Sequence, residues 1–218
     1  MRTELLIGWL LLLPSIRLVA QTIELKSTFD RDLEGWTVSV GVAMYRALGG
    51  NPGGFIRTTD LFGWNAYHAP ASFLGNQSAA YGGVLHLEQQ VLSSDGANQP
   101  MVVISDGTTM LQFFTTPPGL TWTVYDIPLL ASGGWEISNG TGGHGPAASE
   151  AQLQTVLANL LFLNLDADWQ TGEDRVDLDN VKLCSASGCT SSVPEPASMG
   201  LLLIGVAASL IVRARRRI

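Results

Sequence analysis

Short apolar or alternating segments, separated by glycine, proline, asparagine and serine, run through most of the chain. This pattern is typical of an all-β protein, because side chains alternate between the two faces of a strand and turns favour these residues. The segments that predict strands span residues 22–29, 36–45, 54–59, 65–70, 83–92, 100–106, 109–116, 121–129, 160–169 and 175–183. Their regular spacing favours a β-sandwich of the jelly-roll type.

Alternation inside these segments also predicts which side chains face the core. In the fifth segment the shared face carries Leu85, Leu87 and Gln89. In the last segment it carries Val176 and Leu178. In the segment before it, the face is made of Leu161, Leu163, Leu165, Ala167 and Trp169. The sequence QTGED between these last two segments predicts a hairpin loop that joins them.

One segment departs from the strand pattern and predicts a short helix. Leu153, Val156, Leu157 and Leu160 recur at helical spacing. Ser149, followed three residues later by Gln152, fits a capping box. We therefore expect one helix that leads directly into the strand at residues 160–169.

Both ends of the chain predict targeting segments. Residues 1–20 carry Arg2 and then an apolar run, as in a secretory signal peptide with cleavage after Ala20; the alternative is a buried N-terminal helix. Residues 197–212 would form a helix of about 24 Å, whereas a hydrocarbon core is about 30 Å thick. Such a helix can still span the bilayer when the arginines extend toward the surface and the bilayer thins. The basic cluster that follows it would stay in the cytoplasm and consists of Arg213, Arg215, Arg216 and Arg217. The ends thus predict an exported body with a C-terminal transmembrane helix.

The charge of the region between these ends restricts its partners. Residues 21–196 hold six lysines and arginines against eighteen acids, a net charge of −12. The sequence has no lysine or arginine between Arg57 and Arg175. Binding to phosphate groups depends on clustered basic side chains, so this region argues against nucleic acid and anionic membrane surfaces.

The chain has two cysteines, Cys184 and Cys189. In an exported protein we expect them to form a disulfide, and half of a metal site is the alternative. The residues around and after them are small and polar, so residues 185–193 predict a Ser/Thr-rich linker.

Two separated blocks resemble the laminin IV type A (laminin B) domain. The first holds Ala69-Pro70, Phe73-Leu74-Gly75 and Tyr81-Gly82-Gly83; the second runs from Trp135 through PAASEAQLQTVLANL to LDNVKL. The resemblance covers residues 60–183 and implies a β-sandwich of extracellular matrix proteins, not known for catalysis, here spanning residues 21–184. One difference is that LNLDADW lacks the basic residue expected in the penultimate strand.

The C-terminal residues 194–218 resemble the PEP-CTERM sorting signal. The tripeptide Pro194-Glu195-Pro196, the apolar run and the arginines are all present. The resemblance implies that exosortase, a membrane protease, recognises the motif and removes the tail. The protein would then reach the cell surface or extracellular matrix of a Gram-negative bacterium. A permanent single-span anchor is the alternative.

The opening segments FDRDLEGW and GGNPGGFI look like the first strands of the galactose-binding-like, carbohydrate-binding jelly rolls. Many of these hold a structural calcium where the first and last strands meet, so the resemblance implies Asp30 and Asp179 as ligands. Solvated acids at a strand edge are the alternative. An EF-hand at Asp166 and Asp168 is disfavoured, because Thr171 and Asp177 stand where that loop needs glycine and glutamate.

Sugar rings stack on exposed aromatic rings, and the best placed are Trp64 and Trp135, which lie near predicted loops; Trp36 and Trp169 fit a core. The leading hypothesis is a non-catalytic surface or matrix protein that binds extracellular polysaccharide. The alternatives are a secreted polysaccharide hydrolase, for which Asp106, Asp126 and Glu136 are the candidate acids and Asp126 and Glu136 the pair to test, and a structural matrix protein without a ligand. The three histidines, His68, His86 and His144, are scattered and indicate structural or surface roles.

Overall fold

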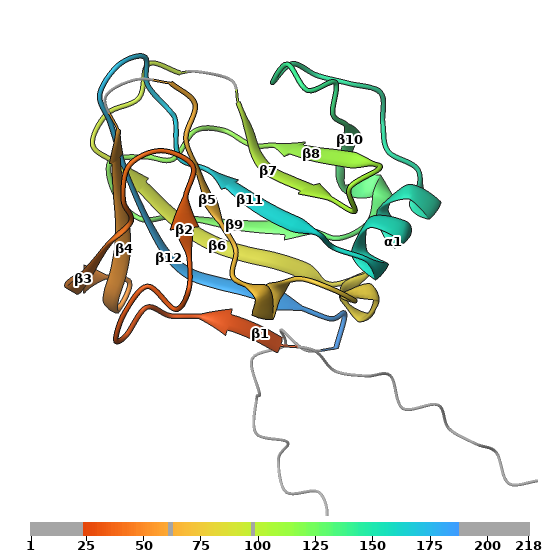
Figure 1. Cartoon of the computed structure of the whole chain (residues 1–218), viewed down its shortest axis with the longest axis horizontal. Helices are drawn as coiled ribbons and strands as arrows, with labels where there is room; N and C mark the ends of the chain where they lie inside the picture. The colour runs from red at the N-terminus through yellow and green to blue at the C-terminus, as the bar shows by residue number, and fades with distance from the viewer. Residues whose placement is uncertain (1–23, 61–62, 97–98, 188–218) are drawn as a thin grey trace, which may run out of the picture.

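Two antiparallel sheets pack face to face to form a β-sandwich (Figure 1), which confirms the predicted fold class. The computed structural model describes residues 24–60, 63–96 and 99–187. The first sheet has the strand order β3-β4-β12-β6-β9. The short strand β1 also pairs with β12, at residues beyond those that pair with β4. Its strands are β1 (Glu24–Ser27), β3 (Met44–Gly50), β4 (Gly53–Asp60), β6 (Val84–Val91), β9 (Thr123–Pro128) and β12 (Asp174–Cys184).

The second sheet has the order β10-β8-β7-β11-β5-β2. Its strands are β2 (Thr37–Val38), β5 (Ala66–His68), β7 (Pro100–Ser105), β8 (Met110–Phe114), β10 (Glu136–Ile137) and β11 (Phe162–Asp166). Short 3-10 helices lie in the connections: η1 (Ala71–Phe73), η2 (Ser78–Ala80) and η3 (Ala131–Gly133). The helix α1 (Glu150–Ala158) lies at one end of the sandwich (Figure 1).

The predicted alternation in β6 is confirmed. Leu85, Leu87 and Gln89 are all fully buried between the sheets. The polar side chain of Gln89 is accommodated because its Nε2 donates to the carbonyl of Asp166 at 2.8 Å and its Oε1 accepts from the Trp169 indole at 3.3 Å. A buried amide is tolerated when it is hydrogen-bonded in this way.

The predicted hairpin between the last two long strands is wrong. β11 pairs with β5 and β7, whereas β12 pairs with β1, β4 and β6 in the other sheet. The loop between them therefore crosses from one sheet to the other. The inward-facing side chains of the two strands meet across the core instead of lying on one sheet, and they are buried: Leu163 and Leu165 on β11, and Val176 and Leu178 on β12. Leu161, which precedes β11, is 60% exposed and does not belong to that face.

The helix begins where the capping box predicts. The Ser149 Oγ accepts from the Gln152 N–H, and the Gln152 Oε1 accepts from the Ser149 N–H. Leu153, Val156 and Leu157 are buried against the end of the sandwich. The helix thus closes one end of the core.

Three tryptophans form the centre of the core, and each indole N–H has an acceptor. Trp36 donates to the Ser27 Oγ at 2.9 Å, and Trp135 donates to the Pro128 carbonyl at 2.8 Å. The core positions of Trp36 and Trp169 are as predicted. Trp135 is also fully buried, so its ring has no face to offer a sugar, and the expectation that it binds ligand is corrected.

Several predicted segments lie outside the described residues. These are the signal peptide 1–20, the sorting tripeptide Pro194-Glu195-Pro196, the apolar run with Arg213, Arg215, Arg216 and Arg217, most of the linker, and Cys189. Cys184 is disulfide-bonded. Among the helices that the structure describes, none has both the length and the apolar character needed to cross a membrane.

Candidate functional site

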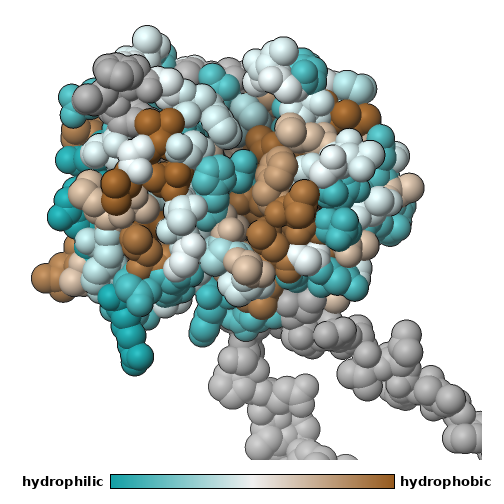
Figure 2. All heavy atoms as spheres, viewed as in Figure 1, coloured by the Kyte–Doolittle hydropathy of each residue, from teal (hydrophilic) through white to brown (hydrophobic). Residues whose placement is uncertain are grey.

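A groove with a volume of about 560 Å³ lies on the outward face of the second sheet, and we call it the Trp64 groove. Figure 2 shows apolar surface gathered over β7 and β11 on this face, with hydrophilic residues around it. The apolar lining consists of Trp64, Pro100, Val103, Met110 and Phe162. The polar lining consists of Gln99, Gln112, Ser138, Thr141 and Asn164, with Gly140 and Gly142 between them. The groove is thus lined without a charged side chain.

The floor of the groove follows from the strand register. Asn164 on β11 lies opposite Val103 on β7, which lies opposite Gln112 on β8. The residues before and after them, such as Leu111 and Leu163, are buried in the core. Because side chains alternate along a strand, the row from Asn164 to Gln112 must point outward.

The neighbouring residue Asn65 holds Trp64 in place. Asn65 is fully buried, its Oδ1 accepts from the Val40 N–H, and its Nδ2 donates to the Thr58 Oγ1, each at 3.1 Å. Its carbonyl accepts from the Ala167 N–H at 3.0 Å. These bonds fix the backbone beside Trp64, whose own side chain remains 45% exposed. An aromatic ring on a fixed backbone can present a flat surface to a ligand.

The loop after β10 forms one wall of the groove. The Gln112 Nε2 donates to the Gly143 carbonyl at 2.7 Å, which ties this loop to β8. Gly142 has φ of +77°, and a Cβ there would lie 2.9 Å from the Gln99 Oε1. A larger residue at this position would push the loop away from Gln99.

Two amides in the groove floor are oriented for hydrogen bonding. The His68 Nδ1 and the Asn164 Oδ1 lie 2.7 Å apart, so a proton on that nitrogen fixes the Asn164 amide. Gln112 is fully buried, and its Oε1 has no hydrogen-bond partner among the described residues. Because that oxygen has no exposed surface, Gln112 holds the loop after β10 in place rather than offering its amide to a ligand. Aromatic, amide and hydroxyl groups without charge suit a neutral, hydroxyl-rich ligand.

The two acids proposed for hydrolysis lie in different sheets. Asp126 on β9 is exposed and lies 2.7 Å from the His86 Nδ1. Glu136 on β10 accepts from the Gly145 N–H and lies 3.0 Å from the His144 Nδ1. Burial alone would raise the pKa of Glu136, but these two hydrogen bonds lower it. A glycosidase acid needs the opposite shift.

The acids predicted to bind calcium lie near each other at a bulge of the first sheet. Asp179 is fully buried, and its carboxylate accepts from the Asn51 N–H at 2.6 Å and the Asn180 N–H at 2.7 Å. Burial, together with the charges of Glu88 and Asp30, raises its pKa to about 6. Glycines keep space beside both acids: a Cβ on Gly50 would lie 2.7 Å from the Asp179 Oδ2, and one on Gly53 would lie 2.9 Å from the Asp30 Oδ1.

This arrangement fits calcium only with help from the backbone. Over residues 24–60, 63–96 and 99–187, no group of three acidic, histidine or cysteine side chains has the geometry of a metal site. Calcium also accepts carbonyl oxygens as ligands. The carboxylates of Asp30 and Asp179 would therefore supply only part of the roughly six to eight oxygens that calcium takes.

Sequence reasoning found Trp64 but missed Gln112, Asn164 and the loop of residues 138–142. The available signal was alternation, because Asn164 lies between Leu163 and Leu165, and Gln112 lies between Leu111 and Phe113. That signal places each side chain on an outward face, but the two form one surface only because β7 lies between β8 and β11.

Comparison with known proteins gives two family matches. The sequence model of laminin B (domain IV) matches residues 66–199, and that of the PEP-CTERM protein-sorting motif matches residues 192–217. No curated protein matches the chain.

Among solved structures, the L4b domain of human laminin alpha-2 is similar with a TM-score of 0.57 and 14% identity, covering 75% of this chain and 98% of that domain. The family 11 carbohydrate-binding module of the cellulase Lic26A-Cel5E of Clostridium thermocellum has a TM-score of 0.43 and 16% identity, over 78% of this chain and 91% of that module. The laminin likeness supports the fold.

Proposed function

The chain belongs to the laminin B (domain IV) family and carries a PEP-CTERM protein-sorting motif, and we propose that it is a non-catalytic protein that exosortase sorts to the cell surface or extracellular matrix. We propose further that its β-sandwich binds a neutral polysaccharide. The observation that carries the binding proposal is the uncharged Trp64 groove. Its exposed indole would stack against a sugar ring, and its amides would bind the hydroxyl groups.

The sorting motif supports the route by which the protein reaches that location. A PEP-CTERM motif implies export, a stage at the inner membrane, and recognition by exosortase. Removal of the C-terminal tail would then release the sandwich among extracellular polysaccharides. A net charge of −12 between the two ends would favour solubility there and disfavour nucleic acid.

The secreted hydrolase is the weaker alternative. Asp126 and Glu136 lie in different sheets, and the pKa of Glu136 is lowered. Neither acid lines the Trp64 groove. The third possibility, a matrix protein without a ligand, predicts that the unchanged protein binds no neutral oligosaccharide.

Replacing Trp64 with alanine is expected to weaken binding of a neutral oligosaccharide about tenfold, because stacking on an aromatic ring contributes about 1.4 kcal/mol. Calorimetry of the full chain in detergent would measure it, with cello-, xylo- and mannohexaose as probes. Trp122→Ala is the matched control, since it removes a partly buried indole that precedes β9 and packs on Phe55 of the first sheet. Equal affinities in the two variants, or no binding of any neutral hexasaccharide by the unchanged protein, would count against the groove.

We also propose a structural calcium ion at Asp30 and Asp179. If it binds, calcium at about 100 times its dissociation constant stabilises the fold by about 2.7 kcal/mol, which raises the midpoint of thermal unfolding by about 5–11 °C. Asp179→Asn should abolish this rise, whereas Asp126→Asn, which removes an exposed carboxylate, should keep it. Thermal unfolding in calcium and in chelator measures both. A midpoint that calcium does not move would remove the ion from the proposal.

A further inference from the structure

Arginines gather at a second pocket, on the outward face of the first sheet. Of the six basic residues in the region between the two ends, Arg46, Arg57 and Arg175 line one pocket of about 500 Å³, which we call the Arg pocket. They come from three neighbouring strands, β3, β4 and β12. In a region with a net charge of −12, such a gathering needs a physical reason.

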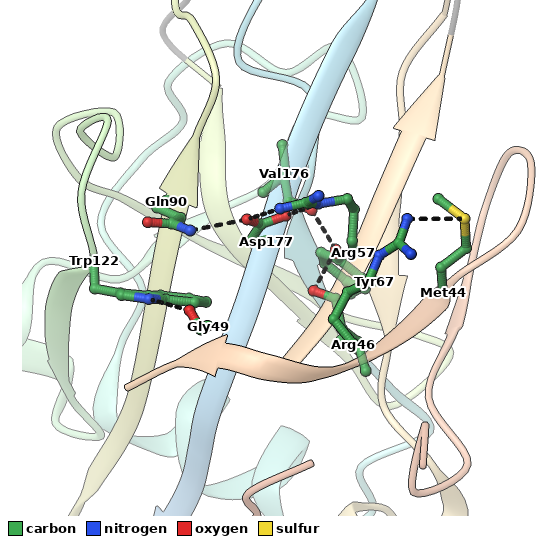
Figure 3. A network of polar contacts seen from close by, with 10 residues as sticks. Met44, Arg46, Gly49, Arg57, Tyr67, Gln90, Trp122, Val176 and Asp177 are labelled. Carbon is green, nitrogen blue, oxygen red and sulfur yellow. Dashed lines mark hydrogen bonds and ion pairs between the residues drawn. The ribbon is translucent and has the colours of Figure 1, made fainter. Parts of the chain in front are cut away.

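One of the three arginines is already neutralised. Arg57 donates to both oxygens of Asp177, at 2.5 and 2.7 Å, and Gln90 donates to the same carboxylate at 2.9 Å (Figure 3). The guanidinium also lies 5.0 Å from the centre of the Phe55 ring. Arg57 and Asp177 therefore form a structural pair that leaves little charge for a ligand.

The other two arginines have no carboxylate partner in the part of the chain that the structure describes. Arg46 contacts the sulfur of Met44 at 3.9 Å (Figure 3), a weak acceptor. The Nε of Arg175 is buried and has no hydrogen-bond partner among the described residues. Guanidinium groups that the protein leaves without an acid are available to an anion.

Two acids, Glu173 and Asp174, also line the Arg pocket, and their formal charges balance those of Arg46 and Arg175. Asp174 is occupied, since its carboxylate accepts from the backbone N–H groups of Trp169 and Gln170. Glu173 remains against the two guanidinium groups of Arg46 and Arg175. The pocket therefore offers an anion the hydrogen-bond donors of Arg46 and Arg175, which no described carboxylate binds, rather than a net positive charge.

We propose that the Arg pocket binds the carboxylate of a uronic acid in an acidic polysaccharide. A guanidinium binds a carboxylate through two parallel hydrogen bonds, which makes the arginine–carboxylate pair strong and directional. Thr59, Ser93 and Gln170 line the same pocket and offer hydroxyl and amide groups to the hydroxyls of the sugar. The choice of a polysaccharide over an acidic peptide rests on these polar groups and on the location given by the proposed function.

The test uses hexagalacturonate as the probe and calorimetry on the full chain in detergent. The double variant Arg46→Gln with Arg175→Gln should bind the probe at least about tenfold more weakly, because it loses two charged hydrogen-bonding groups. Lys26→Gln with Lys182→Gln is the matched control: it removes two positive charges from paired positions of the same sheet, away from the pocket, and should leave affinity unchanged. Glu173→Gln should strengthen binding, since it removes the competing acid.

Three results would overturn the proposal. They are absence of hexagalacturonate binding, an equal loss in the lysine control, and equal affinity for a hexaglutamate peptide, which would indicate recognition of a protein. Methyl-esterified hexagalacturonate should not compete with hexagalacturonate for the Arg pocket, because its carboxylates are blocked. Trp64→Ala should leave hexagalacturonate binding intact, so failure of the Trp64 groove and failure of the Arg pocket are distinguishable.

Discussion

Replacing Arg57 with methionine is expected to lower the free energy of unfolding by about 3 kcal/mol, because it leaves a buried carboxylate without its partner. Asp177 is 2% exposed, and its two oxygens accept from Arg57 while one also accepts from Gln90. After the substitution, the single hydrogen bond from Gln90 would have to stabilise the charge. Urea denaturation at pH 7 measures the loss.

The control for this prediction is Arg46→Met. It removes the same group from the neighbouring strand, where no described carboxylate pairs with it, and should change the free energy of unfolding by no more than about 0.5 kcal/mol. Combining Arg57→Met with Asp177→Leu should recover much of the loss, because no buried charge then remains. If Arg57→Met and Arg46→Met cost the same, the pair does not stabilise the sheet as argued.

The elements that could be predicted from sequence are those decided by neighbouring residues. The alternation of Leu85, Leu87 and Gln89 indicated which face of β6 is buried. Ser149 and Gln152 indicated where α1 begins, since a capping box joins residues three apart. Such signals need no knowledge of what the rest of the chain does.

The hairpin prediction failed because alternation does not say which strand is the partner. β11 and β12 follow each other along the chain, and both turn leucines inward. The same pattern would arise if the two strands were paired in one sheet or if they lay in opposite sheets with their leucines meeting across the core. The structure has the second arrangement, because β11 and β12 belong to opposite sheets. Only long-range pairing, such as β12 with β6, decides between the two.

The candidate site shows the same limit at single residues. Trp64 and Trp135 both stand near glycines, but Trp64 is 45% exposed while Trp135 packs against Phe113 in the core. The sequence near a loop does not specify which way an indole turns. Gln112 and Asn164 were visible as polar residues in strands, but β7 must lie between their strands before they form one surface.

Asp166 illustrates a residue whose importance depends wholly on its surroundings. It ends β11 and is 2% exposed; the Asp168 N–H and the Trp64 indole lie near its carboxylate and partly oppose a rise in its pKa, but neither oxygen accepts a hydrogen bond of good geometry from the described residues. Burial, and then the charge of Asp168, raises its pKa well above the ordinary value for an aspartate. The carboxyl group is therefore neutral in the folded protein at pH values where it is ionised in the unfolded chain.

Asp166→Asn is expected to stabilise the protein at neutral pH and to do so increasingly as pH rises. Because the folded-state pKa is raised, the unfolded chain releases the proton first, and the stability of the unchanged protein falls above the unfolded pKa of about 3.9. The fall approaches about 1.4 kcal/mol per pH unit until the folded pKa is passed. Asparagine has no proton to release, so the difference between variant and unchanged protein should widen from pH 4 to pH 7. Urea denaturation at intervals of half a pH unit measures it, with Asp126→Asn as the control for net charge. Parallel stability curves for Asp166→Asn and the unchanged protein would show that burial of this carboxyl carries no such cost.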